Sequence, residues 1–210
     1  MAKTVSNYDL QVDVGKRIFL KYDQEQMIRK FWMEADEEYI YLTYLNTPCR
    51  IGRRVGGIEE YIEGVWTECR SYSTVMTIYD LLCCHKGETA PSLFGQWCAV
   101  GTFVLTGVTH TDTFTKKYAQ LFDNRLDELK AACEKLGGVL LERMAGADLT
   151  CKFQVVPFFP VLLQFWEGDN EFSPKLILLW DRNTDRFMHF ETTFYLQGDL
   201  LERLWNCMKE

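Results

Sequence analysis

Motifs that identify common enzyme classes are missing from this sequence. It contains no GxGxxG, GxxxxGK[ST], GxSxG or HExxH pattern, which excludes only the enzymes that need those motifs. Its eight Cys form no CxxC pair and follow no regular spacing. The sequence therefore assigns no reaction and no cofactor by motif, and both stay unknown at this point.

Positive charge is scarce and scattered. The formal net charge is −7, and no run of Lys or Arg is longer than two residues. Proteins that bind duplex nucleic acid use a basic stripe to neutralise phosphates, so we expect no nucleic-acid partner. The nearest cluster, Arg50, Arg53 and Arg54, is interpreted as a solvated loop or strand edge in preference to an anion site.

Long apolar runs are also absent. No stretch approaches the ~20 apolar residues of a membrane helix, and the opening residues MAKTVSNYDL lack the apolar segment of a signal peptide. We therefore expect no membrane partner and a cytoplasmic location, in which the Cys residues are mostly reduced thiols.

The chain does have enough apolar surface to build a core. Of its 210 residues, 47% are hydrophobic, and they include 14 Phe, 10 Tyr and 6 Trp. This supply offsets the entropy lost on ordering and argues against disorder. The length suits one domain over residues 1–210. A homo-oligomer stays open, because nothing in the sequence fixes the oligomeric state.

Helical periodicity predicts most of the helices. In residues 7–22, Leu10, Val14 and Ile18 recur on one face. Asp23 is expected to cap a short helix that ends at Phe31. Further helices are predicted over 72–86, over 116–136, and from about residue 194 with Thr192 or Thr193 as its cap.

Strand signals are strongest late in the chain. Residues 38–45 are rich in β-formers and predict an early strand, and 49–57 predict a second strand that is weakened by its Gly residues. Residues 149–155 alternate between apolar and polar, while 161–167 and 175–181 are apolar on both faces, as in central strands. Together with the helices, this order predicts an α+β fold with a mixed or mainly antiparallel sheet packed with several helices.

An acidic loop joins the last two predicted strands and is the first candidate site. The stretch FWEGDNEFSP carries the candidates Trp166, Gly168, Asp169, Glu171 and Phe172, with Glu167 at its edge. We favour a structural turn, in which Gly168 supplies a positive φ and Asp169 bonds nearby backbone N–H groups. The alternative is a cation site for Mg²⁺ or Ca²⁺.

His189 and Glu191 form a second candidate pair. On an extended segment they would face the same side, where an imidazole and a carboxylate are able to act as an acid–base unit or as two metal ligands. A hydrogen-bonded structural His is the favoured reading, because no third partner is visible in the sequence.

The stretch LLCCHKG invites a metal interpretation that helical geometry opposes. On a helix Cys83 and Cys84 point about 100° apart, and His85 lies on roughly the opposite side from Cys83. Most free Cys residues behave as small core residues. We therefore expect no metal site.

Several of these segments resemble one family. FWEGDNEFSP followed by LLWD resembles the W-x-G-D-x-E-F-P…L-F-D signature of an uncharacterised prokaryotic family, domain of unknown function 3786. IYDLLCC, FGQW, Phe114, LGG with GAD, and FFP resemble other family segments in the same order. The resemblance is weaker in residues 1–70. Trp180 replaces the family's usual Phe, and Ser173 displaces its Pro by one place.

The resemblance implies a context but no reaction. Members of the family are typical of anaerobic prokaryotes, and similar domains are fused to iron–sulphur and corrinoid-type modules, which implies a role near corrinoid or one-carbon metabolism. This chain lacks four clustered Cys for an iron–sulphur cluster, so the implied iron–sulphur or corrinoid group belongs to a protein partner.

Two functional hypotheses and one structural alternative follow. The first is a binding or accessory domain that presents Trp166 and Phe172 beside the loop acids. The second is an enzyme of unknown reaction that uses acid–base groups of this loop together with His189 and Glu191. In the remaining alternative, the acidic loop is a structural turn with no site.

Overall fold

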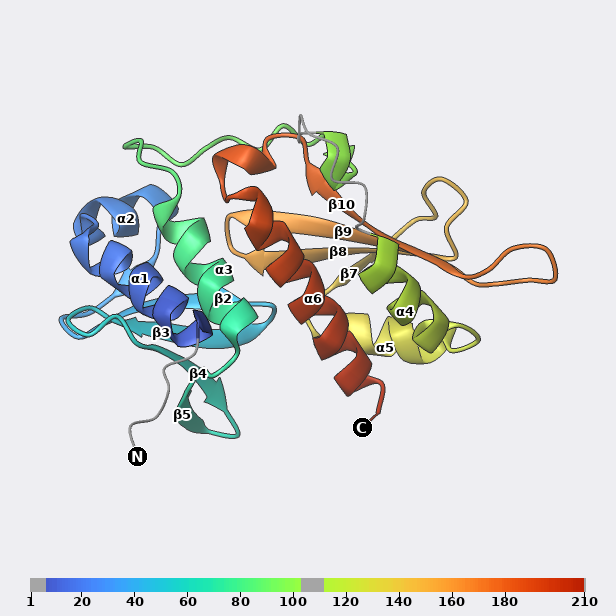
Figure 1. The fold of residues 1–210 in the computed structure, drawn as a ribbon, viewed down its shortest axis with the longest axis horizontal. Helices are drawn as coiled ribbons and strands as arrows, with labels where there is room; N and C mark the ends of the chain where they lie inside the picture. Colours follow the sequence, from blue (N-terminus) through green and yellow to red (C-terminus); the bar gives the residue numbers. More distant parts are fainter. Residues whose placement is uncertain (1–6, 103–111, 210) are drawn as a thin grey trace.

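The structure is a computed structural model that describes residues 7–102 and 112–209. These residues form two five-stranded sheets with helices between and beside them (Figure 1). Every strand pairing in the described ranges is antiparallel. The α+β fold class is therefore confirmed, in its antiparallel form, but with two sheets.

The first sheet forms in the first third of the chain. Its order is β1-β2-β3-β4-β5, and the strands are β1 (Glu34–Ala35), β2 (Tyr39–Tyr44), β3 (Thr47–Gly52), β4 (Ile58–Ile62) and β5 (Val65–Glu68). Two helices precede it, α1 (Asn7–Lys21) and α2 (Gln24–Phe31). The predicted cap of α2 is confirmed, because the Asp23 carboxylate accepts a hydrogen bond from Gln26 N.

The second sheet has the order β6-β10-β9-β8-β7. Its strands are β6 (Trp97–Cys98), β7 (Val139–Leu141), β8 (Leu149–Val156), β9 (Phe159–Trp166) and β10 (Lys175–Asp181). The hairpin of β9 and β10 confirms the two predicted central strands. Nearly every residue of β9 is buried. The short helix η1 (Val100–Thr102) follows β6 in the chain, and η2 (Thr184–Arg186) follows β10.

Four longer helices complete the structure. They are α3 (Tyr72–Cys83), α4 (Asp112–Phe122), α5 (Leu126–Lys135) and α6 (Phe190–Cys207). The prediction of one helix over 116–136 is wrong, because Asn124 adopts a left-handed φ of 59° and separates α4 from α5. None of the helices in the described ranges has the length and apolar character needed to cross a membrane.

The apolar stripe predicted on α1 does not face the core. The residues of α1 that are buried are Gly15 and Phe19, and α1 packs along α3. Leu10, Val14 and Ile18 are instead 47–50% exposed. The helix is where the periodicity predicted it, but its buried face is offset from the stripe.

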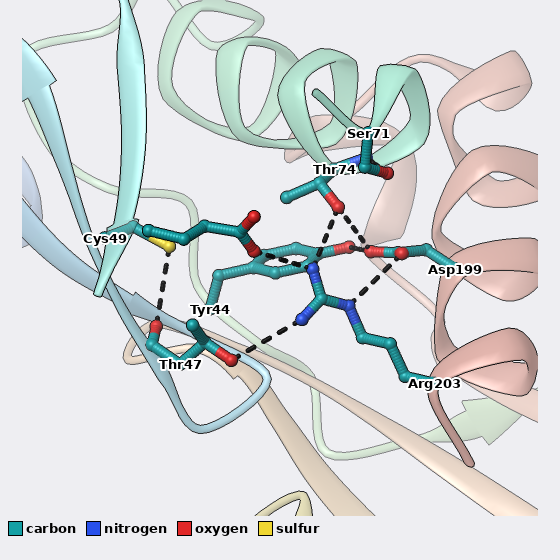
Figure 2. Close-up of polar contacts among 8 residues, drawn as sticks. Tyr44, Thr47, Cys49, Ser71, Thr74, Asp199 and Arg203 are labelled. Carbon is teal, nitrogen blue, oxygen red and sulfur yellow. Dashed lines mark hydrogen bonds and ion pairs between the residues drawn. The ribbon is translucent and has the colours of Figure 1, made fainter. Parts of the chain in front are cut away.

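Helices α3 and α6 lie side by side and connect the part of the protein built on the first sheet to the part built on the second sheet (Figure 1). At the buried end of this contact, the Asp199 carboxylate accepts hydrogen bonds from Tyr44 at 2.8 Å and Thr74 at 2.9 Å. Arg203 reaches from α6 to Glu60 at 2.8 Å and to Asp199 at 3.2 Å (Figure 2). One cluster of buried apolar residues also includes members of both sheets.

That residues 1–210 form one domain stays a prediction.

Candidate functional site

The acidic loop between β9 and β10 closes on itself. Asp169 Oδ1 accepts hydrogen bonds from the backbone N–H groups of Glu171 at 2.8 Å and Phe172 at 2.7 Å. These two bonds lower the pKa of the Asp169 carboxyl. Phe172 is 69% exposed, and the Lys175 ammonium lies 5.0 Å from the centre of the Trp166 ring. The polar contacts of Asp169 therefore match those of a turn.

Gly168 is required by a close approach, not by its φ angle. Its φ lies outside the left-handed region, so the prediction of a positive φ is wrong. A Cβ atom at this position would lie 2.8 Å from Pro174 Cδ and 3.3 Å from Asp123 Oδ2. Gly168 N donates to Asp123 Oδ1 at 2.9 Å, which ties the start of the loop to the end of α4.

His189 lies elsewhere, at the start of α6. It is the N-cap residue of that helix, and Glu191 is in the first turn, so the extended segment predicted for the pair is wrong. The helix begins four residues before the predicted position, and neither Thr192 nor Thr193 is its N-cap. No side chain of the helix forms a cap bond there; instead Asp80 of α3 accepts a hydrogen bond from the backbone N–H of His189.

Asp80 uses both of its carboxylate oxygens at this contact. Oδ2 accepts from His189 N at 2.7 Å and from the Thr192 hydroxyl at 2.5 Å. Oδ1 lies 2.6 Å from His189 Nδ1. The Asp80 side chain is 13% exposed, whereas that of His189 is 68% exposed. The imidazole is thus held by a nearly buried carboxylate while its ring reaches solvent.

A pocket of about 430 Å³ opens beside this pair, between α1, α3 and the start of α6. Its walls are mainly apolar and aromatic, and its polar groups gather where α3 meets α6. The lining residues with apolar or aromatic side chains are Val14, Ile18, Tyr72, Met76, Tyr79 and Tyr195. Apolar walls with a few convergent polar groups are typical of small-molecule sites.

Cys84 adds a third functional group at the polar end. Ligand atoms of Asp80, Cys84 and His189 all lie within 4.8 Å of one another. Burial and, to a smaller extent, the nearby Asp80 charge raise the pKa of the Cys84 thiol to about 11. The thiol is therefore protonated near neutral pH, which opposes its use as an unassisted nucleophile.

The two predicted candidate regions are not brought together. Figure 1 shows the β9–β10 loop at one end of the molecule, away from the start of α6. His189 and Glu191 line the pocket, whereas Trp166, Gly168, Asp169, Glu171 and Phe172 do not. An acid–base unit made from the loop acids and His189 has no geometric support.

Sequence reasoning missed Asp80 as a site residue and set Cys84 aside. The signal for Asp80 was present, because it is the one charged side chain in the helical stretch YSTVMTIYDLLC. Cys84 follows four residues later, on the same face of a helix. Pairing either with His189 required the three-dimensional contact between α3 and α6.

Comparison with known proteins gives a family and no neighbour of known activity. A family model described as "Domain of unknown function (DUF3786)" matches residues 23–203. No curated protein matches the chain, and no solved structure matches it.

Proposed function

The chain belongs to the family of domain of unknown function 3786, and we propose that it is a binding protein. Its ligand is a small molecule with an apolar body, held in the pocket between α1, α3 and α6. The observation that carries this proposal is the combination of apolar walls and a polar end made by Asp80, Cys84 and His189.

The size and chemistry of the pocket support this proposal. A volume of about 430 Å³ lies within the range of about 300–1,000 Å³ that small-molecule sites occupy. Another pocket in the described residues, beside α2, is lined by Gln26, Arg29, Lys30, Glu88 and Thr89 together with Trp32 and Ala90, so charged and polar residues outnumber apolar ones around it. The pocket at α1 is better suited to an apolar ligand.

The exposed stripe of α1 gives the pocket its outer wall. Val14 and Ile18 are about half exposed in the free protein, and covering apolar surface is favourable by roughly 25 cal/mol per Å². Asp80, Cys84 and His189 lie inside the residues matched by the family model, while Val14 and Ile18 precede them. The polar end is therefore the part of the site that lies in the family domain.

The cellular context of this binding role rests on the family resemblance alone. That resemblance supports an accessory role in anaerobic corrinoid or one-carbon metabolism, with an iron–sulphur or corrinoid protein as the partner. The composition supports a cytoplasmic location and no nucleic-acid partner. These finer statements are part of the proposal, and binding in the pocket does not depend on them.

The test is a fluorescence titration with N-phenyl-1-naphthylamine, an uncharged apolar probe. Val14→Asp places a charge in the outer wall, and we expect it to weaken probe binding at least tenfold, since burying an unpaired charge costs more than about 1.4 kcal/mol. The matched control is Val65→Asp. Val65 on β5 is 63% exposed and is not a lining residue of the pocket.

The titration has one set of results that supports the proposal and another that contradicts it. Saturable binding by the unmodified protein and by Val65→Asp, with weak binding by Val14→Asp, supports the proposal. Absence of saturable binding, or equal affinity in all three proteins, contradicts it. Far-ultraviolet circular dichroism confirms that each variant retains its helices before the titration.

A further inference from the structure

We propose that Asp80, Cys84 and His189 form a binding site for a divalent transition-metal ion of the Zn²⁺ class. The site lies at the polar end of the pocket and uses one carboxylate oxygen, one thiolate sulphur and one imidazole nitrogen, and the Cys84 thiol releases its proton to solvent when the ion binds. It goes beyond the binding of an apolar ligand and does not require that ligand.

The backbone positions these three groups on two elements. Asp80 is in α3, and Cys84 is the residue that caps the C-terminal end of that helix. Residues four apart are neighbours on one face of a helix, which avoids the geometric objection to adjacent Cys83, Cys84 and His85. His189 comes from the N-cap of α6, and the three ligand atoms lie within 4.8 Å of one another.

The donor set selects the class of ion. Oxygen, sulphur and nitrogen donors from Asp, Cys and His are all used by Zn²⁺, whereas Mg²⁺ and Ca²⁺ prefer oxygen ligands alone. Three protein ligands leave the fourth tetrahedral position for water or a substrate. Since all three residues line the pocket, that position is available to a group of the pocket ligand.

The neighbouring contacts support the carboxylate as a ligand. Asp80 Oδ2 is held by His189 N at 2.7 Å and by the Thr192 hydroxyl at 2.5 Å. Groups that hold a ligand in this way orient it and strengthen metal binding. Oδ1, the oxygen that faces the imidazole, is then the oxygen directed to the metal.

Metal entry requires a small local movement. Tetrahedral bonds of about 2.1 Å separate neighbouring donor atoms by about 3.4 Å, so the Oδ1 to Nδ1 distance of 2.6 Å must increase. The His189 side chain is 68% exposed. A rotation of this ring opens the pair without disturbing the buried contacts of α6.

The test is Zn²⁺ binding to the full chain, kept reduced and stripped of metal with a chelator, then followed by native mass spectrometry and competition titration. We expect one zinc ion per chain. Cys84→Ser and His189→Gln should each weaken binding by more than about 100-fold, because even changes to groups that only orient a ligand cost about 10–100-fold.

Matched controls use the same residue types outside the site. Cys98→Ser changes a partly buried Cys on β6, and His85→Gln changes the His next to Cys84 in the sequence; neither residue belongs to the group of three ligands. Both variants should bind zinc as the unmodified protein does. Binding that survives in Cys84→Ser, or that is lost in a control, overturns the proposal.

Cobalt gives a second readout that does not depend on variants. Co²⁺ bound through the Cys84 thiolate produces a sulphur-to-metal charge-transfer absorption, which Cys84→Ser should abolish. No zinc retention and no such absorption would mean that Asp80 serves only to cap α6. The apolar probe titration tests the pocket separately, since it uses no metal, so failure of one proposal leaves the other open to its own result.

Discussion

Among the polar contacts that α6 makes with the other described elements, one at Asp199 and one at Asp80 differ in whether their groups can reach an outside molecule. At the first, Asp199 accepts hydrogen bonds from Tyr44 and Thr74 while Arg203 reaches Glu60. Asp199 and Glu60 are both less than 10% exposed. At the second, Asp80 contacts His189 and Thr192 at the edge of an open pocket.

The difference distinguishes a structural contact from a site. The buried contact is closed, since each of its charged groups is matched by a partner inside the protein, and burial with a neighbouring Asp199 charge holds the pKa of Tyr44 well above its usual range. The contact at Asp80 places an exposed imidazole and a thiol beside a cavity. Chemistry with an outside molecule is available only at the second.

The largest expected effect is on the closed contact. Asp199→Ala leaves the buried Tyr44 hydroxyl without its acceptor and leaves Glu60 as the carboxylate that Arg203 still contacts, and removing one partner of a buried pair costs about 3–5 kcal/mol. Urea unfolding should show that loss of stability. Zinc affinity should change less than about threefold, since the contact is separate from the pocket; a large loss of zinc from the folded variant would break the comparison.

A smaller effect on stability is expected at the open contact. Asp80→Ala removes the acceptor that caps α6, and loss of a helix cap costs about 0.5–2 kcal/mol. The same change should abolish zinc binding. Asp199→Ala should therefore lose more stability than Asp80→Ala, whereas Asp80→Ala should lose more zinc affinity than Asp199→Ala. If one variant loses more in both measurements, the distinction between the two contacts is contradicted.

Glycine replacements compare α6 with the acidic loop. Gly198 lies in α6, where an added Cβ would meet nothing within 4 Å among the described residues apart from the adjoining helix backbone, so Gly198→Ala should stabilise the protein by about 0.5–1 kcal/mol. Gly168→Ala should destabilise it by about 1–3 kcal/mol, because its Cβ would meet Pro174. Thermal unfolding of the two variants should therefore shift in opposite directions.

The smallest effect is a pH dependence in the acidic loop. Two backbone hydrogen bonds lower the pKa of Asp169 in the folded state, so its ionised form contributes stability above the unfolded pKa of about 4, and this is lost as the pH falls through the lowered folded value. Urea unfolding should give a larger free energy of unfolding for the unmodified protein than for Asp169→Asn at a pH of about 7. This difference in free energy should become smaller at a pH of about 3. A constant difference would rule out this role.

Local sequence signals predicted most elements but not their partners. The cap at Asp23 is local, because its carboxylate accepts from the backbone N–H of Gln26, three residues along the chain. Such a cap is therefore visible in the sequence. The hairpin of β9 and β10 was visible as two apolar segments around a turn. The break at Asn124 was missed because the apolar spacing continues across it, and a single left-handed residue leaves no periodic trace.

The candidate site shows the same limit. The WEGDNEF block was the most specific match to the family, yet Asp169 in it bonds to its own loop. His189 was identified, but its partner Asp80 is 109 residues away in the sequence. Convergence of side chains across such a separation depends on helix packing, which residue spacing does not encode.

The central claim is that the pocket between α1, α3 and α6 is where this protein binds, and backbone NMR shift mapping with N-phenyl-1-naphthylamine tests it most directly. Amide shifts are predicted at Gly15, Ile18, Met76 and Cys84, with none at residues 168–172 of the acidic loop. Shifts that gather on the loop and leave the pocket unchanged would contradict the claim.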